Sequence, residues 1–304
     1  MSRARVLLGV GVGALALSAC GAGERSAASI GGHDISHTDV ERVLSALADI
    51  PSLGIPHDVD AGTFDPQSAR QVVGLMIVHE ATNAVLADNG ESITEQDRAA
   101  FLDTAPAEDP LMALPEDVLA FAADTQVAQT ALGRIETPAD ADLARRYRQD
   151  PTALGVFCVR HILSETEAAA AEARAQLEDG ADFATLAADV SIDPTAADNG
   201  GALQGPSGEA CMPTAQAGQL LDATFYEAAA GAVPGALVGP VETSFGWHVL
   251  EALPYEEAAP SIGALFDQFQ GSLLLDGYLR RADVFVDPRY GSWDAAALIV
   301  VARS

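Results

Sequence analysis

Two short extended stretches around a pair of glycines come first, from Ala28 on, and then the pattern of apolar residues becomes helical. Ala28–Ser36 predicts a short strand, a Gly-Gly turn and a second extended piece. Thr38 then supplies a cap for a helix. The apolar residues of this helix recur every three or four positions: Val40, Val43, Leu44 and Leu47. The pattern therefore predicts a β-hairpin followed by a helix that buries one face.

Helical spacing and helix-stopping residues continue through the first half of the chain. Ile50–Pro66 is an exception, because its prolines and glycines predict a loop. Asn89-Gly90 and Pro151 are stop signals for the helices before them. The predicted helices are Ser68–Asp88, Thr94–Asp103, Glu116–Arg134 and a helix that starts with Thr137-Pro138 and ends at Gln149.

The pattern changes at Gly155. Val156–Leu163 predicts a strand, and Ser164 with Glu167 has the spacing of a capping box that opens a helix to Glu178. The rest of this segment predicts a helix at Asp182–Val190, a long loop at Ser191–Gly218, a helix at Leu220–Ala230, and strands at Leu237–Thr243 and Trp247–Leu253. The middle of the chain thus mixes strands and helices.

The last part returns to a helical pattern. Pro260–Ala282 predicts a helix, and Asp283–Asp287 alternates like an edge strand. A lone edge strand leaves backbone groups unpaired, so we expect this strand to pair near Ala28–Ile30. The two flanks would then form one domain, with the middle segment inserted between them.

The N-terminus has the pattern of an export signal. Arg3 and Arg5 precede an apolar run, Val6–Leu17, which is too short to span a bilayer by itself. The run ends in Leu17-Ser18-Ala19-Cys20, which resembles the bacterial lipobox, in which the cysteine is lipidated. The alternative is an ordinary cleaved signal with an incidental cysteine at position 20. Both interpretations predict export, and the first predicts a lipid anchor on the extracytoplasmic face of the bacterial cell membrane.

Composition narrows the range of functions. All 16 basic residues among the 304 are arginine, and against 44 carboxylates they leave a net charge of −28. Such a surface repels phosphate, which disfavours nucleic acid and anionic lipid headgroups as partners. Three cysteines are too few for a metal scaffold or a disulfide-dense fold.

For most of the histidines, the sequence gives no support for a catalytic or metal-binding role. His33 and His37 are four residues apart, but a Gly-Gly turn and the absence of a third ligand favour surface histidines over a metal site. His79-Glu80 starts like a zinc-protease motif and fails at Asn83. His161 and His248 remain, each within an apolar strand pattern.

Ordered motifs surround these two histidines. His161-Ile162-Leu163 comes first, then the GADFATLA run of residues 180–187, and then Ser191-Ile192-Asp193. Gly200-Gly201-Ala202-Leu203 and the GPVETSFGWH run of residues 239–248 complete the order. This order resembles the parvulin family of peptidyl-prolyl cis/trans isomerases over about residues 156–253.

The resemblance implies roles for individual residues. His161 and His248 match the paired active-site histidines, Asp193 matches a position that holds Cys or Asp, and Thr243 matches the hydroxyl partner of the pair. The apolar wall for the proline ring corresponds to Leu203, Leu221 and Phe225. This chain departs from the family at Ala202 and Gln204, where a carboxylate and a glycine are usual. No cofactor and no metal are implied.

The flanks resemble SurA-like exported chaperones, through the opening hairpin and a closing segment at residues 287–291. The resemblances together imply an α+β fold in which a parvulin domain, FKBP-like in its α/β architecture, is inserted into a mainly helical chaperone domain. The expected parts are a signal peptide (1–20), an N-terminal helical domain (21–155), a parvulin domain (156–254) and a C-terminal helix and strand (255–304) that pack back on the N-terminal domain.

Two functions follow from this resemblance. One is a foldase that isomerises X-Pro bonds in unfolded exported chains, with the membrane reached only through a lipid anchor. The other is a holdase whose parvulin domain binds peptides with weak or no catalysis. In either case Glu165 and Glu167, directly after the first strand, would repel phosphate, so no preference for phosphorylated Ser/Thr-Pro is expected. The sequence does not specify an oligomeric state.

Cys158 and Cys211 are expected to form a disulfide. If Cys20 carries lipid, these two thiols remain in an oxidising compartment, where an even pair normally closes. The alternative is two buried free cysteines.

Overall fold

The computed structural model describes residues 26–53, 55–58, 63–106, 108–205 and 208–303. The expected signal peptide and Cys20 lie outside these residues. Among the helices of the described part, none combines the length and apolar character needed to cross a membrane.

The structure is a mixture of helices and short strands. The helices are α1 (His37–Ala48), α2 (Pro66–Asp88), α3 (Glu95–Leu102), α4 (Glu116–Leu132), α5 (Asp140–Gln149), α6 (Glu167–Glu178), α7 (Phe183–Val190), α8 (Ala196–Asn199), α9 (Thr214–Leu220), α10 (Ala223–Ala230) and α11 (Tyr255–Arg281). Short 3₁₀ helices are η1 (Pro51–Leu53), η2 (Pro110–Ala113) and η3 (Pro151–Leu154). The strands are β1 (Ala28–Ile30), β2 (His33–Ile35), β3 (His57–Asp58), β4 (Thr63–Phe64), β5 (Val156–Phe157), β6 (Val159–Ser164), β7 (Met212–Pro213), β8 (Leu237–Thr243), β9 (Gly246–Ala252), β10 (Val284–Val286), β11 (Ser292–Asp294) and β12 (Ile299–Val301).

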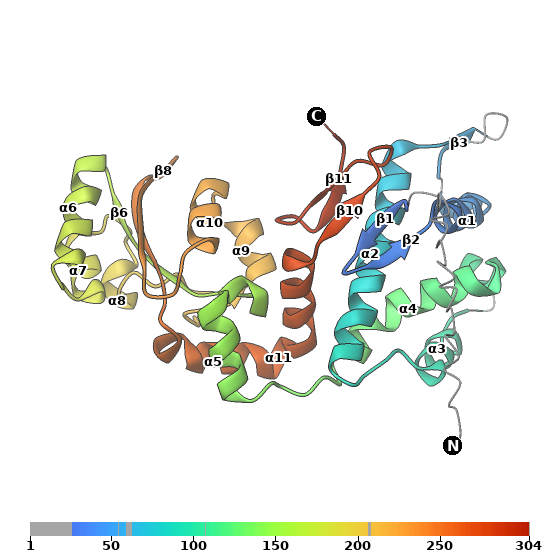
Figure 1. Ribbon diagram of the computed structural model, residues 1–304, viewed down its shortest axis with the longest axis horizontal. Coiled ribbons are helices and arrows are strands. Elements are labelled where there is room, and N and C mark those ends of the chain that lie inside the picture. Colours follow the sequence, from blue (N-terminus) through green and yellow to red (C-terminus); the bar gives the residue numbers. More distant parts are fainter. Residues whose placement is uncertain (1–25, 54, 59–62, 107, 206–207, 304) are drawn as a thin grey trace, which may run out of the picture.

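The molecule has two lobes connected by α11. Figure 1 shows α6, α7, β6 and β8 in one lobe and α1 to α4 with β1, β2 and β10 in the other, while α11 runs between them. The second lobe is built from both ends of the chain. The lobe that contains β6 and β8 comes from the middle of the chain alone.

The strands of the helical lobe join the two chain ends. β1 is the central strand of a three-stranded antiparallel sheet, with β10 on one side and β2 on the other. Ala28 lies opposite Val286, and Ile30 lies opposite Val284. The predicted pairing of the closing strand with the opening hairpin is therefore confirmed.

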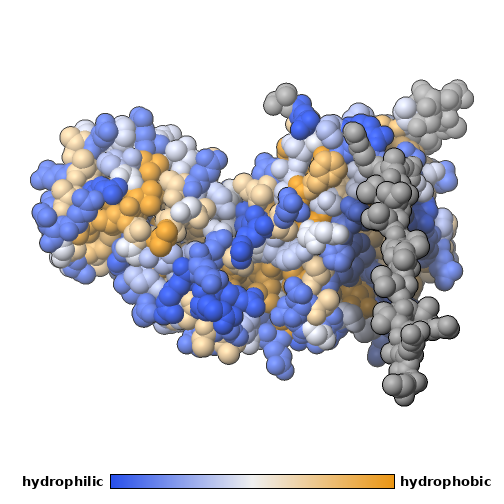
Figure 2. Space-filling view, viewed as in Figure 1, coloured by the Kyte–Doolittle hydropathy of each residue, from blue (hydrophilic) through white to orange (hydrophobic). Residues whose placement is uncertain are grey.

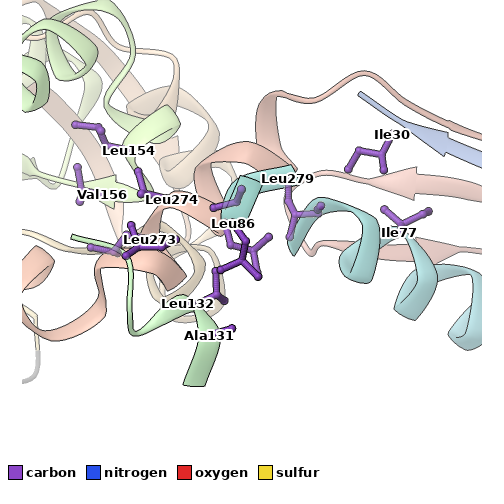
Figure 3. Packing of buried hydrophobic residues seen from close by; sticks show 14 of the residues in the cluster. Ile30, Ile77, Leu86, Ala131, Leu132, Leu154, Val156, Leu273, Leu274 and Leu279 are labelled. Carbon is purple, nitrogen blue, oxygen red and sulfur yellow. The ribbon is translucent and has the colours of Figure 1, made fainter. Parts of the chain in front are cut away.

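One large core fills the helical lobe and reaches the junction. Figure 3 shows Ile30 of β1, Ile77 and Leu86 of α2, and Leu273, Leu274 and Leu279 of α11 in the same cluster. At Gly155, a Cβ would lie 2.2 Å from the carbonyl oxygen of Leu273, so only glycine permits this close approach to α11. The change of pattern at Gly155 thus marks the contact between the two lobes.

The middle lobe is built on an antiparallel sheet with the order β6-β9-β8. Ile162 of β6 and Val249 of β9 face the helices α6 and α7, which cover one side of the sheet. Val159 and Leu250 point to the other side, where α10 packs. Residues two apart on a strand share a face, so His161 and His248 also point to this second side.

A two-stranded ribbon joins the lobes. β5 pairs with β7 and contributes Val156 to the helical core and Phe157 to the core beside α10. Next to this ribbon, the sulfurs of Cys158 and Cys211 are 2.06 Å apart, at bonding distance, and their Cα atoms are 4.2 Å apart. The expected disulfide is thus present at the junction of the two lobes.

Several predicted helix starts were displaced by a few residues. Ser36, not Thr38, caps α1, and Thr166, not Ser164, caps α6. Ser164 is instead the last residue of β6, because the strand pairs with β9 as far as Trp247. α5 starts at Asp140 rather than at Pro138, and its N-cap, Ala139, makes no side-chain cap bond.

Three segments are more structured than the sequence pattern predicts. The predicted loop Ile50–Pro66 contains η1, β3 and β4. The predicted loop Ser191–Gly218 contains α8, β7 and most of α9, and the predicted helix Leu220–Ala230 is divided into the end of α9 and α10. β11 and β12 form a hairpin after β10, where no element was predicted.

Candidate active site

Strand register brings His161 and His248 together. His161 lies opposite Leu250, and Leu163 lies opposite His248, so the two histidines are diagonal neighbours on one face of the sheet. Their side chains are buried, with only 6% and 4% of each residue exposed. The rings stack at a centroid distance of 5.4 Å with 17° between their planes.

The two rings belong to a continuous chain of hydrogen-bonding groups. The Nδ1 atoms of His161 and His248 are 3.1 Å apart. Nε2 of His161 is 2.9 Å from Oδ2 of Asp193, and Nε2 of His248 is 2.9 Å from Oγ1 of Thr243. The structure thus brings together the four residues that were singled out as the catalytic set.

Local loops hold both ends of this chain of groups. At one end, the backbone N–H and hydroxyl of Thr195 both donate to Oδ1 of Asp193 at 2.8 Å. The hydroxyl oxygen of Ser191 accepts from Leu163 N at 3.1 Å, which ties the Asp193 loop to β6. At the other end, Phe245 N donates to the Thr243 hydroxyl at 3.1 Å within the β8–β9 turn. Both ends are therefore fixed by backbone contacts.

The charge state of each group follows from its surroundings. Burial lowers the pKa of His161, and the nearby Asp193 only partly opposes this effect. Burial and the neighbouring His161 lower the pKa of His248 to about 4. Partial burial alone would raise the pKa of Asp193, but hydrogen bonds from Thr195 and the contact with His161 lower it below its ordinary value. At neutral pH both histidines are neutral and Asp193 is ionised.

These charge states give every hydrogen bond in the chain a direction. An ionised Asp193 can only accept, so Nε2–H of His161 donates to it, and Nδ1 of His161 is then an acceptor. His248 must donate from its own Nδ1, which leaves its Nε2 to accept from the Thr243 hydroxyl. All donors therefore point toward Asp193.

An apolar pocket of about 350 Å³ opens beside this network. Leu203, Leu221 and Phe225, the predicted wall for a proline ring, all line it together with both histidines and Asp193. The Phe225 ring meets the His161 and His248 rings edge-on at centroid distances of 5.6 and 4.9 Å. Thr243 is absent from the pocket lining and reaches the pocket only through His248.

The unusual Gly-Gly-Ala-Leu-Gln turn keeps its pairing with the first strand. Gly201 has a φ of +80°, and a Cβ there would lie 2.4 Å from the carbonyl oxygen of His161. His161 N donates to Gly201 O at 2.8 Å, and Leu203 N donates to Val159 O at 2.9 Å. Alanine at position 202 and glutamine at 204 therefore leave Leu203 in place against the pocket.

A family model now identifies this part of the chain. The model described as Rotamase: PPIC-type PPIASE domain matches residues 161–253. These residues are a PPIC-type parvulin domain. The match begins at His161 and includes Asp193, Thr243 and His248.

Curated relatives of the parvulin domain include foldases and chaperones. The foldase protein PrsA of Clostridium kluyveri is 30% identical over 155 residues, which cover 51% of this chain and 41% of that protein. A parvulin-like PPIase of Rickettsia bellii is 35% identical over 31% of each chain. The chaperone SurA of Pseudomonas syringae pv. tomato is 34% identical over 38% of this chain and 27% of that protein. The chain thus spans less than half the length of these relatives.

Solved structures with detectable likeness include a PrsA protein and a parvuline. The crystal structure of PrsA from Bacillus subtilis is 17% identical, covers 86% of this chain and 93% of that chain, and has a TM-score of 0.30. The solution structure of NmPin, the parvuline of Nitrosopumilus maritimus, is 24% identical, covers 33% of this chain and 96% of that chain, and has a TM-score of 0.28.

Sequence reasoning missed several groups that line the pocket of the parvulin domain. Leu163, Pro194, Leu220, Asp222 and Phe245 complete the lining. Leu163 could have been inferred, because it lies two residues after His161 on the same strand face. Phe245 lies within a quoted motif, but nothing in its spacing shows that its side chain is 70% exposed at the pocket.

The other histidines are apart from the parvulin domain. His37 was expected at the surface but is buried, because Tyr290, Asp287 and Arg289 of the closing segment surround its ring. His33 is exposed on β2, as expected. In the described part of the chain, no three His, Cys, Asp or Glu side chains are grouped as metal ligands.

Proposed function

We propose that this protein is a foldase that catalyses cis/trans isomerisation of X-Pro bonds in unfolded polypeptides. The observation that carries the proposal is the directed hydrogen-bond chain of Asp193, His161, His248 and Thr243 beside an apolar pocket, within a PPIC-type domain. We assign the catalytic roles to these four residues and the binding of the proline ring to Leu203, Leu221 and Phe225.

The geometry matches the physical task of an isomerase. Amide resonance sets a barrier of about 18–20 kcal/mol to rotation about the imide bond, and uncatalysed exchange takes tens to hundreds of seconds. The reaction breaks no covalent bond, so the catalyst must favour the twisted imide over the planar one. An apolar pocket does this by removing the water that stabilises the more polar planar form.

The histidine network contributes a fixed electrostatic environment. Because both rings are neutral and each ring N–H has one acceptor, the network presents ordered dipoles instead of mobile charges. Phe225 packs edge-on against both rings and belongs to the pocket wall. A change in the network would therefore shift Phe225, and with it the surface that binds the proline ring of the substrate.

A holdase without catalysis is the second candidate, and the departures at Ala202 and Gln204 favour it. The retained backbone pairing of Gly201 and Leu203 with β6 supports the isomerase instead. An isomerisation assay separates the two candidates, because a holdase would bind the peptide without accelerating its exchange.

The decisive experiment uses residues 21–304, which omit the leader and the lipidation cysteine, with a neutral proline tetrapeptide. We expect exchange clearly faster than the uncatalysed background, and a reduced rate for Asp193→Ala purified in the same way, which controls for contaminating isomerases. Background-level exchange with the wild-type chain would overturn the isomerase proposal.

We further propose that the protein acts after export, held by a lipid on Cys20 at the extracytoplasmic face of the membrane. The Arg3 and Arg5 leader and the Leu17-Ser18-Ala19-Cys20 ending support this. Labelling with a fatty acid in a bacterial host should modify the wild-type protein and not Cys20→Ser. Equal labelling of both would contradict the anchor.

We also propose that residues 21–155 and 255–304 form one chaperone domain into which the parvulin domain, residues 156–254, is inserted. The β1–β10 pairing and the shared core of α2 and α11 support this arrangement. The proposed partners are unfolded exported polypeptides.

A further inference from the structure

The charged groups at the rim of the proline pocket are of one sign. Among the described residues, the side chains that line the pocket include two carboxylates, Asp193 and Asp222, and no arginine. Both carboxylates act on the His248 ring, since each opposes the lowering of its pKa. They therefore converge on the same side chain from two different loops.

Asp222 has capacity for a further partner. It is the N-cap of α10, and its Oδ1 accepts from Thr224 N at 2.9 Å and from Phe225 N at 3.2 Å. In the part of the chain that the structure describes, its second carboxylate oxygen has no hydrogen-bond partner. Asp193, in contrast, is fully used by Thr195 and His161.

The arginines of the parvulin domain do not balance these charges. Residues 156–254 contain 14 carboxylates and two arginines, Arg160 and Arg174. Arg160 lies on the opposite face of the sheet, paired with Glu251 at 2.6 Å and with Glu257 at 2.9 Å. Arg174 pairs with Glu178 at 2.8 Å and donates to the carbonyl oxygen of Gly239. An anionic substrate therefore meets no unpaired cation of this domain.

The exposed surface around the pocket suits a cationic side chain in a second way. Phe245 lines the pocket with 70% of its side chain exposed, and the face of an aromatic ring attracts a guanidinium. Figure 2 shows apolar residues gathered on the lobe that contains β6 and β8, with hydrophilic residues around them.

We propose that this pocket selects prolyl bonds that have an arginine or lysine side chain next to the proline, and that Asp222 determines this preference. The inference rests on the proposed isomerase function and names its substrate class. A cation beside the ring would take the free oxygen of Asp222, while a carboxylate or phosphate would face Asp222 and Asp193 across a short distance.

A peptide series tests the preference with the same chain, residues 21–304. The peptides are Ala-Xaa-Pro-Phe, with Xaa as arginine, leucine, glutamate or phosphoserine. We expect kcat/KM for arginine to exceed that for leucine by about threefold to tenfold, which is the range of a partly exposed ion pair. Glutamate and phosphoserine should both be slower than leucine, and added salt should reduce all these differences.

Two substitutions that each remove one negative charge test the role of Asp222. Asp222→Asn retains an N-cap acceptor for α10 and removes the charge, so the arginine-to-leucine ratio should fall toward one. Glu227→Gln removes a charge from an exposed position on the same helix, outside the pocket lining, and should leave the ratio unchanged.

The possible outcomes separate the two proposals. No acceleration of the leucine peptide would overturn the isomerase function itself. Acceleration of the leucine peptide without a faster arginine peptide would overturn only the preference. A ratio that falls equally in both variants would show that the net charge of the domain, and not Asp222, sets the preference.

Discussion

Two sites in which histidine lies beside carboxylate shift the pKa of the histidine in opposite directions. In the parvulin domain, His161 and His248 share one carboxylate, Asp193. In the helical lobe, His79 of α2 lies between two carboxylates, with Nε2 at 3.3 Å from Asp124 and Nδ1 at 3.7 Å from Glu80.

Direct contact with carboxylates distinguishes His79 from His248. Burial alone would lower the pKa of His79, but hydrogen bonds to Glu80 and Asp124 raise it above its ordinary value. His248 is hydrogen-bonded to His161 and Thr243 instead, and burial lowers its pKa. Burial also lowers the pKa of His161, which Asp193 opposes only in part. The same residue types thus give a chargeable structural site in one lobe and a neutral network in the other.

The largest expected effect comes from the disulfide at the junction of the two lobes. Loss of the Cys158–Cys211 bond should lower the free energy of unfolding by about 4 kcal/mol, from the loop-closure entropy of a 53-residue separation. Denaturant titration of oxidised and reduced protein, and of the double variant Cys158→Ala/Cys211→Ala, measures it. An unchanged midpoint after reduction would show that the bond does not stabilise the fold.

The next effect separates the two histidine sites by activity. His248→Ala removes the donor to His161 and the acceptor for Thr243, so we expect kcat/KM to fall by about tenfold, as for the loss of a buried hydrogen bond of about 1.4 kcal/mol. His79→Ala is the matched control, because it empties the other site. Equal loss of activity in both variants would contradict the assignment.

The pH dependence of stability should have opposite signs at the two sites. The folded pKa of His248 lies below that of the unfolded chain, so its contribution should improve as pH rises from about 4 to 6.5. The folded pKa of His79 is raised, so its contribution is present below about pH 6.5 and should be lost as pH rises further.

Unfolding titrations at pH 5 and pH 7 measure these signs. We expect the stability advantage of wild type over His248→Ala to grow between these pH values, and its advantage over His79→Ala to shrink. Parallel changes in both variants would mean that the two sites do not differ in the way described.

The smallest expected effect tests the end of the network. Thr243→Val keeps the side-chain shape and removes the donor to His248 and the acceptor for Phe245 N. The loss of about 0.5–1 kcal/mol should lower kcat/KM by about twofold to fivefold, and Thr243→Ser should restore the rate. A fully active Thr243→Val protein would remove this hydroxyl from the network.

The sequence predicted the candidate site best where short motifs determine which residues come together. His161, Asp193, Thr243 and His248 were selected by the order of their motifs, and strand pairing brings them within hydrogen-bond distance. Their proton arrangement was not predictable, because it depends on burial and on the backbone groups around Thr195.

Segments that lack local propensity signals were missed. β7 lies in a stretch rich in Gly, Ala and Pro and becomes a strand only through pairing with β5, more than 50 residues earlier. The β11–β12 hairpin has no Gly or Asn in its turn, and Leu298 takes a φ of +57° there. Local propensity signals were therefore absent in both places.

The pairing of β1 with β10 has a consequence for the order in which the chain assembles. The opening strand at Ala28–Ile30 can pair with Val284–Val286 only after the C-terminal part of the chain is present. The helical lobe therefore cannot complete its sheet until almost the whole chain is available. The β6, β8 and β9 sheet needs only residues 159–252, and its contacts close much shorter loops. A chain that emerges with its N-terminus first would therefore complete the lobe that contains β6, β8 and β9 before it completes the helical lobe.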